Sequence, residues 1–242
     1  MDPVYAARYR ALYERHWWWR AREAVVLREL GRVRPRDGWR RALDVGCGDG
    51  LLFERLLSHA THVEGVEPDA ALVTDRQRAG GRIHVQPFDA SFRPAHRFDL
   101  MLFLDVIEHM EDAAGAIEHA AALLEPGGLV LVTVPAFRHL WTTHDDLNRH
   151  VTRYTRTELT RLLSPHFTVE RARYFFRWVH PAKVVQRVLE AVRPPTPAPP
   201  QIPPAPLNAT LYAMSRVEEA ALSWSTMPLG SSLVAVARSR SH

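Results

Sequence analysis

The chain contains one cysteine, Cys47, so a disulfide bond within the chain is impossible. It also lacks an uninterrupted apolar run long enough to cross a bilayer, since the run Leu100–Leu104 is followed at once by Asp105. Its first residues, Met-Asp-Pro-Val-Tyr, lack the apolar stretch of a secretory signal. These three absences predict a cytoplasmic protein with no transmembrane segment.

Charge of one sign is not concentrated anywhere in the sequence. Lys and Arg number 31 against 27 Asp and Glu, which gives a formal net charge of +4, and the arginines are spread along the chain. A nucleic-acid-binding protein more often carries a concentrated basic stripe, so a nucleic-acid partner is not favoured. The 242 residues, of which 46% are hydrophobic, contain no internal repeat and suit a single α/β domain.

From residue 41 onward, short apolar runs alternate with longer helical segments. Strands are expected at Ala42–Val45, His62–Val66, Arg82–Gln86, Phe98–Leu104, Gly128–Val134, Phe167–Tyr174 and Ser232–Ala237. Helices are expected at 5–33, 51–58, from the second strand to about Ala79, from the fourth strand to Leu124, and at 157–163, 177–193 and 209–224. This alternation is typical of βαβ units and of a parallel sheet covered by helices on both faces.

Two segments stand apart from this alternation. Trp17, Trp18 and Trp19 are consecutive, and because successive helical residues point about 100° apart, they cannot all be buried on one helix face. We therefore expect at least one of them to close over a ligand. Residues 194–206 are rich in proline, which predicts an extended connector, with a ligand for an SH3-type domain as the alternative.

The segment Leu43–Gly50 carries the chemistry, because it lies where the first strand should turn into the first helix. Its glycines follow the spacing G-x-G-x-G, and Leu51 occupies the place of the third glycine in a dinucleotide-binding turn. A pyrophosphate needs a helix N-terminus without negative charge, whereas Asp44 and Asp49 flank this turn. The turn therefore suits a ligand that carries positive charge and no phosphate, such as the methionyl part of S-adenosylmethionine.

Three further carboxylates follow the next strands of the predicted sheet. Glu67 comes at the end of the second strand, where a carboxylate can accept both hydroxyls of a ribose. Asp89 follows the third strand and can accept a hydrogen bond from an adenine amine, and Asp105 ends the fourth strand. Because ligands of open α/β sheets bind outside the carboxyl ends of the strands, these residues are expected at one site.

In these motifs and their order, the sequence resembles the class I S-adenosylmethionine-dependent methyltransferases, in the subgroup of small bacterial enzymes with an aromatic N-terminal helix. The matching segments are Leu43–Gly50, Val66–Asp69, Phe88–Ala90, Leu104–Asp112 and Leu124–Gly128. The resemblance implies a Rossmann-like, doubly wound, mostly parallel seven-stranded sheet with an antiparallel last strand. It also implies that S-adenosylmethionine is the cofactor and that S-adenosylhomocysteine is its product.

The resemblance implies cofactor contacts at Gly46, Gly48, Glu67 and Asp89. The position of other residues around the same strand ends and on the aromatic helix adds further expected cofactor contacts, namely Trp18, Arg22, Asp44, Pro68, Ala90, Leu104, Asp105 and Val106. Cys47 is expected to pack in the turn without a chemical role.

We expect one domain, with residues 39–174 as the cofactor-binding core and 228–242 as the last strand and tail. Residues 1–38 are expected to form a helical N-terminal lid, and 175–227 a helical and Pro-rich insertion that completes it. Candidate substrate contacts are Trp19, Asp145, His150 and Tyr154, and candidate general bases are His109 and His144. A metal site built from His139, His144 and Asp145 matches no dedicated zinc spacing, so no metal is expected.

The expected reaction is displacement at the sulfonium methyl by an oxygen, nitrogen or carbon nucleophile of a small-molecule or peptide acceptor, with oxygen favoured. An NAD(P)-dependent oxidoreductase is one alternative, which Leu51 and the acid-rich turn disfavour. A non-catalytic module that binds S-adenosylmethionine is the other. Adenine-amine methyltransferases commonly carry Asn or Asp followed by Pro-Pro and an aromatic residue after the fourth strand. The sequence Leu104-Asp105-Val106-Ile107 departs from that pattern, which disfavours methylation of nucleic-acid bases.

Overall fold

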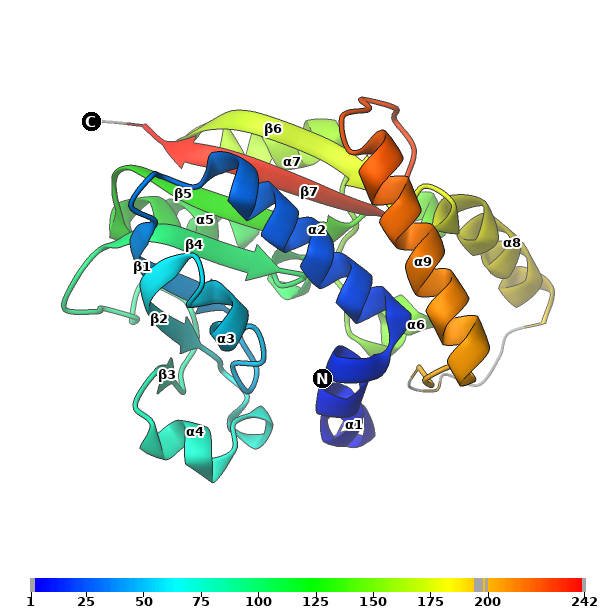
Figure 1. Ribbon diagram of the computed structural model, residues 1–242, viewed down its shortest axis with the longest axis horizontal. Coiled ribbons are helices and arrows are strands. Elements are labelled where there is room, and N and C mark those ends of the chain that lie inside the picture. The colour runs from blue at the N-terminus through cyan, green and yellow to red at the C-terminus, as the bar shows by residue number, and fades with distance from the viewer. Residues whose placement is uncertain (1–2, 194–197, 199, 241–242) are drawn as a thin grey trace.

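A seven-stranded sheet with the order β3-β2-β1-β4-β5-β7-β6 forms the centre of the molecule (Figure 1). The computed structural model describes residues 3–193, 198 and 200–240, with side chains from residue 8 onward. The strands are β1 (Trp39–Val45), β2 (Ala60–Val66), β3 (Ile83–His84), β4 (Phe98–Leu104), β5 (Leu124–Pro135), β6 (Phe167–Phe175) and β7 (Ser232–Ser239). Strands β1 to β5 pair in parallel, and β7 runs antiparallel between β5 and β6. The predicted fold class is therefore confirmed.

Helices cover both faces of the sheet, with α2 in front and α5 and α7 behind it in the view of Figure 1. The α-helices are α1 (Pro3–Arg15), α2 (Trp17–Val33), α3 (Phe53–Leu56), α4 (Asp75–Ala79), α5 (Ala113–Leu123), α6 (Thr143–Leu147), α7 (Arg156–Leu163), α8 (Val179–Val192) and α9 (Ala205–Leu222). Short 3-10 helices lie at Ala70–Leu72, Ile107–His109 and Arg138–Leu140. None of the helices in this described part of the chain is long and apolar enough to span a membrane.

The central strand β4 shows why the sheet needs helices on both sides. Its residues 100 to 103 are all fully buried. Leu100 and Leu102 belong to the hydrophobic cluster that contains the apolar face of α2, whereas Met101 and Phe103 belong to the cluster on the opposite face, with α5 and α7. Successive strand residues point to opposite faces, so a continuous apolar run is buried only between two layers.

The helix predicted at 5–33 is wrong as a single element, because the chain breaks at His16 into α1 and α2. The side chain of His16 is buried, and its Nδ1 accepts a hydrogen bond of 3.1 Å from the backbone N–H of Trp18. His16 thus satisfies one of the open amides at the start of α2. Gly31, expected to end the helix, lies inside α2.

Other boundaries also differ from the prediction. The helix expected at 51–58 is reduced to α3, the third strand to two residues, and the polar loop after β5 contains α6. The Pro-rich stretch was expected to be free of helix through residue 206, but α9 already begins at Ala205, since the first turn of a helix tolerates proline. Residues 194–197 and 199 of that stretch lie outside the described residues.

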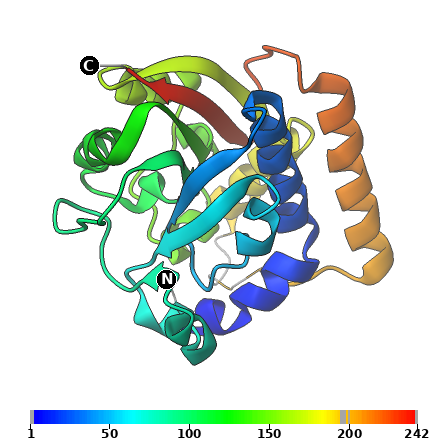
Figure 2. The same ribbon diagram turned by 60° about the vertical axis from the view of Figure 1, so that its left-hand side comes forward.

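Helix α9 lies beside α2, as both views of the ribbon show (Figures 1 and 2). A buried ion-pair network joins them through β6. Arg173 of β6 contacts Glu29 of α2 at 2.7 Å and Glu219 of α9 at 2.6 Å. Near the other end of α9, Asn208 accepts a hydrogen bond from the backbone N–H of Trp17 and donates one to the carbonyl of Arg15. The late insertion therefore holds the junction between the two N-terminal helices in place.

Candidate active site

A cleft of about 790 Å³ opens at the carboxyl ends of β1, β2, β4 and β5. The strand order reverses beside β1, between β2 on one side and β4 on the other, and such a reversal is where ligands of open α/β sheets bind. Because the cleft crosses several strands, it has two ends. We call the part around Gly46, Gly48 and Glu67 the cofactor end, and the part around Glu108, His109, His144 and His150 the acceptor end.

The glycine turn after β1 forms one wall of the cofactor end. Gly46 has a φ of +68° and Gly48 a φ of +55°, in the left-handed region that favours glycine. A Cβ atom on Gly46 would lie 2.6 Å from Cγ2 of Val106, which is too close for any residue but glycine without a shift of the neighbour. Gly46 therefore allows the turn after β1 to approach the segment after β4.

Buried carboxylates give the cofactor end a negative character. Glu67 accepts hydrogen bonds of 2.9 Å from the backbone N–H groups of Gly48 and Asp69, and it lines the cleft. Asp44 is buried within β1, its Oδ1 has no hydrogen-bond partner among the described residues, and burial raises its pKa to about 7. A positively charged ligand nearby would stabilise the ionised form of such a carboxyl, whereas a phosphate would not. These residues fit an ammonium or a sulfonium.

Two acidic residues of the predicted site have other contacts. Asp49 accepts hydrogen bonds from the N–H and the hydroxyl of Thr74, both at 2.9 Å, and pairs with Arg10. Asp89 is exposed and accepts hydrogen bonds from Ser91, and both Asp89 and Ala90 lie outside the described lining of the cleft. The cofactor contacts expected of Asp89 and Ala90 thus stay a prediction.

The aromatic run at the start of α2 borders the cleft with all three rings, and the same rings also pack. Trp17 and Trp18 have ring centroids 5.9 and 5.8 Å from that of Phe176, and Trp19 is buried against His16. The two roles weighed for this run, packing and closing over a ligand, therefore coincide. Trp18 and Trp19, expected at cofactor and substrate, are both placed where those contacts are possible.

Arg22 and Asp105 form a mostly buried ion pair beside these rings. Arg22 also donates a hydrogen bond of 3.2 Å to the carbonyl of Leu104, and its guanidinium lies 5.4 Å from the ring centroid of Trp18. Asp105 has a φ of +57°, a conformation that Asp tolerates better than most residues. Arg22 was expected to contact the cofactor directly, and the structure places it in the cleft wall with an internal partner.

Two predicted substrate residues at the acceptor end lie behind the cleft surface. Asp145 is fully buried, and its carboxylate accepts hydrogen bonds from Arg153 at 2.7 and 3.0 Å and from His150 at 2.8 Å. Tyr154 is buried too, with its hydroxyl 3.4 Å from the carbonyl of Ile107. Neither residue is in the described lining of the cleft. The substrate contacts expected of both residues therefore stay a prediction. In the structure, Asp145 holds His150 and Arg153 in place.

The predicted histidines His109, His144 and His150 do line the cleft. Burial, together with the charge of Lys183, lowers the pKa of His144 to about 4. Desolvation by the surrounding atoms, together with His150, lowers the pKa of His109 to about 4, although His109 as a whole residue is exposed. Both rings are therefore neutral at pH 7.

Comparison with known proteins decides the family. Residues 18–166, more than half of the chain, match the model of a family described as "Methyltransferase domain". The chain belongs to this methyltransferase family. This membership makes the chain a methyltransferase, which argues against the oxidoreductase alternative.

Curated relatives of the methyltransferase include the ubiquinone biosynthesis O-methyltransferases of Bradyrhizobium sp. (strain ORS 278) and of Coxiella burnetii (strain Dugway 5J108-111). Each is 34% identical, over 103 and 95 residues respectively, which is 38% and 37% of this chain. The matched part spans 39% and 41% of the length of those two relatives.

Solved structures share the fold at low sequence identity. A chain from the complex of the Haloferax volcanii Trm112 methyltransferase activator with a methyltransferase is 17% identical. It has a TM-score of 0.62 and covers 99% of this chain and 96% of its own. The N-methyltransferase NodS from Bradyrhizobium japonicum WM9, in complex with S-adenosylhomocysteine, is also 17% identical. It has a TM-score of 0.53 and covers 95% and 90% of the two chains.

Several lining residues of the methyltransferase were missed in the sequence, namely Tyr9, Glu108, Asn148, Lys183, Gln186 and Glu190. Three of them come from α8, where Lys183, Gln186 and Glu190 form a polar stripe at helical spacing that faces the cleft. The opposite, apolar side of α8 is exposed, with Val188 at 58% and Leu189 at 63%. The amphipathic pattern was visible, but its polar side faces inward, opposite to the usual arrangement of a surface helix.

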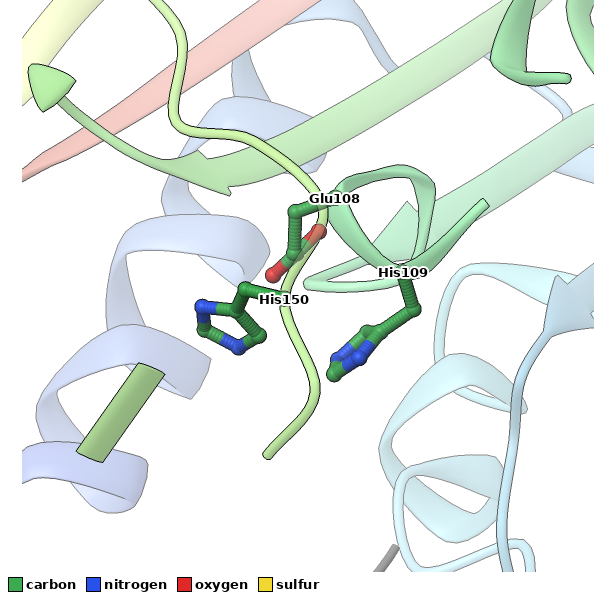
Figure 3. Close-up of side chains that lie close together, drawn as sticks. All are labelled: Glu108, His109 and His150. Atoms are coloured by element: carbon green, nitrogen blue, oxygen red, sulfur yellow. The ribbon is translucent and has the colours of Figure 1, made fainter. Parts of the chain in front are cut away.

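The metal site weighed for the methyltransferase, from His139, His144 and Asp145, does not form a group of ligands in the described structure. His139 is exposed and packs its ring against His180 instead. The three-residue group that does gather consists of Glu108, His109 and His150 (Figure 3).

Proposed function

We propose that this methyltransferase transfers the methyl group to a hydroxyl oxygen of a small-molecule or peptide acceptor whose skeleton is apolar and can pack against aromatic rings. The observation that carries the proposal is the composition of the acceptor end, where Glu108, His109, His144 and His150 line a cleft that the three tryptophans of α2 also line. The polar group suits one hydroxyl, and the rings suit an apolar skeleton. The name of the curated relatives, O-methyltransferase, supports the same atom.

For the cofactor, we propose contacts with the glycine turn at Gly46 and Gly48 and with Glu67, and with the chain at Pro68, Leu104 and Val106, all of which line the cleft. The bound cofactor supplies a sulfonium methyl group that is already activated for displacement. Glu67 keeps its carboxylate turned to this end through its two backbone hydrogen bonds. Burial raises the pKa of Asp44, beside the turn, to about 7, and a cationic ligand would favour its ionised form.

The protein's main contribution to the reaction is alignment and exclusion of water. Trp17, Trp18 and the polar stripe of α8 close the cleft from the lid side. His144 is the candidate contact for the acceptor hydroxyl. With a pKa of about 4 it accepts a hydrogen bond at pH 7 but holds a transferred proton weakly, so it orients the hydroxyl more than it removes its proton.

The proposal is tested by incubating the purified chain with methyl-labelled S-adenosylmethionine and a matched set of phenols, catechols, anilines and thiophenols. We expect label in the hydroxyl-bearing members, with the labelled carbon bonded to oxygen in the NMR spectrum. Label found only on nitrogen, carbon or sulfur would refute the choice of oxygen. His144→Gln is expected to slow transfer about 10- to 100-fold without changing the affinity for S-adenosylhomocysteine.

A further inference from the structure

Three side chains that can ligate a metal meet at the acceptor end of the cleft. Glu108 and His109 belong to the 3-10 helix after β4, and His150 follows α6, about 40 positions further along the chain. One potential ligand atom from each lies within 4.8 Å of the others. The two imidazole rings are 4.7 Å apart between centroids and nearly perpendicular. Figure 3 shows the three residues gathered around a small common space.

Glu108 is the unusual member of this cluster. It is fully buried, and neither of its carboxylate oxygens has a hydrogen-bond partner among the described residues. A buried carboxylate without hydrogen bonds is costly unless it is protonated or coordinates a metal ion. The buried carboxylate of Glu108 is therefore expected either to carry a proton or to contact a cation.

His150 is held in the manner of a metal ligand. Its Nδ1 bonds to the carboxylate of Asp145 at 2.8 Å, which directs the other ring nitrogen away from Asp145. Asp145 is itself fixed by two hydrogen bonds from Arg153. A carboxylate that orients the outer nitrogen of a histidine is the usual support for a metal-bound imidazole.

The backbone joins the two segments that carry these ligands. The carbonyl of Glu108 accepts hydrogen bonds from the N–H groups of Val151, at 2.7 Å, and Thr152, at 3.4 Å. His150 is therefore held beside Glu108 by main-chain contacts that need no cation. The positions of the ligands are preorganised, which lowers the cost of binding.

We infer that Glu108, His109 and His150 bind one divalent transition-metal cation, with open coordination positions toward the acceptor. Two imidazoles and one carboxylate suit zinc, iron(II), cobalt(II) or manganese(II), and three protein ligands leave room for an exogenous oxygen. All three residues line the cleft, so the open positions face the space that the acceptor occupies.

The role of the cation rests on the proposed function, whereas its binding does not. An acceptor hydroxyl that coordinates the cation loses its proton to water more readily. Its oxygen then forms a bond to the methyl carbon while the carbon–sulfur bond breaks, and the sulfonium becomes a neutral thioether. This route supplies the proton removal for which the low pKa of His144 is poorly suited.

The test uses Co²⁺ as the probe, with the full chain freed of any affinity tag and treated with chelator. Visible absorption and equilibrium dialysis measure binding to the wild type, Glu108→Gln, His150→Gln and the control His139→Gln, an exposed histidine outside the cluster. We expect one Co²⁺ per chain, with an affinity at least tenfold weaker in the two cluster variants and unchanged in the control. Zn²⁺ should displace the bound Co²⁺ and so abolish its visible absorption.

The inference is overturned if the wild type binds no Co²⁺, or if both cluster variants bind it as tightly as the control does. In either case a proton, and not a cation, neutralises the buried carboxylate of Glu108. Affinity for S-adenosylhomocysteine, measured on the same samples, reports folding and the cofactor end separately. If the wild type does not bind S-adenosylhomocysteine, the cofactor assignment is refuted instead. If Glu108→Gln fails to fold, the Co²⁺ affinity of His150→Gln decides whether the metal site exists.

Discussion

Asp145→Asn should destabilise the protein strongly, although Asp145 is not in the cleft lining. The carboxylate accepts from the N–H of Thr142 at 2.8 Å, from His150, and twice from Arg153, whose side chain is 4% exposed. The substitution leaves the guanidinium of Arg153 buried without a counter-charge and turns an amide N–H₂ toward donors. Breaking one partner of a buried pair costs about 3–5 kcal/mol, which for a chain of this size lowers the melting temperature by roughly 6–20 °C.

The matched control is Asp146→Asn, because Asp146 is the next residue and is exposed, and among the contacts described its carboxylate accepts a hydrogen bond only from the indole N–H of Trp141. Thermal melts followed by circular dichroism compare the two variants with the wild type. Burial opposes the shift, but hydrogen bonds from His150 and Arg153 lower the pKa of Asp145. Its contribution is therefore present above about pH 4 and lost as the pH falls further, so the stability gap should be constant from pH 7 to 5 and shrink below 4. A melting temperature within 2 °C of the control at pH 7 would refute this reasoning.

Three predictions concern the cofactor end. Burial raises the pKa of Asp44 to about 7, so below pH 7 the binding of cationic S-adenosylmethionine must release the proton of Asp44. Calorimetry should therefore show that the affinity for S-adenosylmethionine rises by up to about tenfold per pH unit from pH 5 to 7, and that it does not change with pH in Asp44→Asn. Glu67→Gln should weaken S-adenosylhomocysteine binding about 10- to 100-fold, since hydrogen bonds to a charged group contribute about 1.5–3 kcal/mol; unchanged affinity would remove Glu67 from the site. Gly46→Ala should lower both stability and cofactor affinity, because its Cβ would meet Val106, and the additional change Val106→Ala should restore part of the loss in a denaturation and binding series.

The fold was predictable where one local signal decides it. Strand β4 is a continuous apolar run with both faces buried, and the glycine turn follows β1 directly, so strand, turn and cofactor end could be read together. The break at His16 was not, because a histidine that caps a helix from a buried position has no distinctive sequence signal. Helix α6 did have one. Thr142 and Asp145 form a capping box in the structure, and their spacing of three residues was present in the sequence.

The acceptor end was harder to predict because its residues come from segments far apart in the chain. His109 and His150 were singled out separately, yet only the fold shows that they share a space with Glu108. The periodicity of α8 was plain, but a helical pattern gives the two faces of a helix without saying which one turns inward. Where a cleft lies beneath a helix, the polar face can be the inner one, as Lys183 and Glu190 show.

The cofactor end and the acceptor end also differ in how their geometry is maintained. The cofactor end is built from backbone turns at strand ends, so its geometry follows from the sheet itself and changes little with the side chains around it. The acceptor end depends on side chains that are held by other side chains, as His150 is held by Asp145 and Arg153. A single substitution there shifts a histidine or leaves a buried charge unpaired. We therefore expect substitutions behind the acceptor end, more than those around the glycine turn, to separate methyl transfer from cofactor binding.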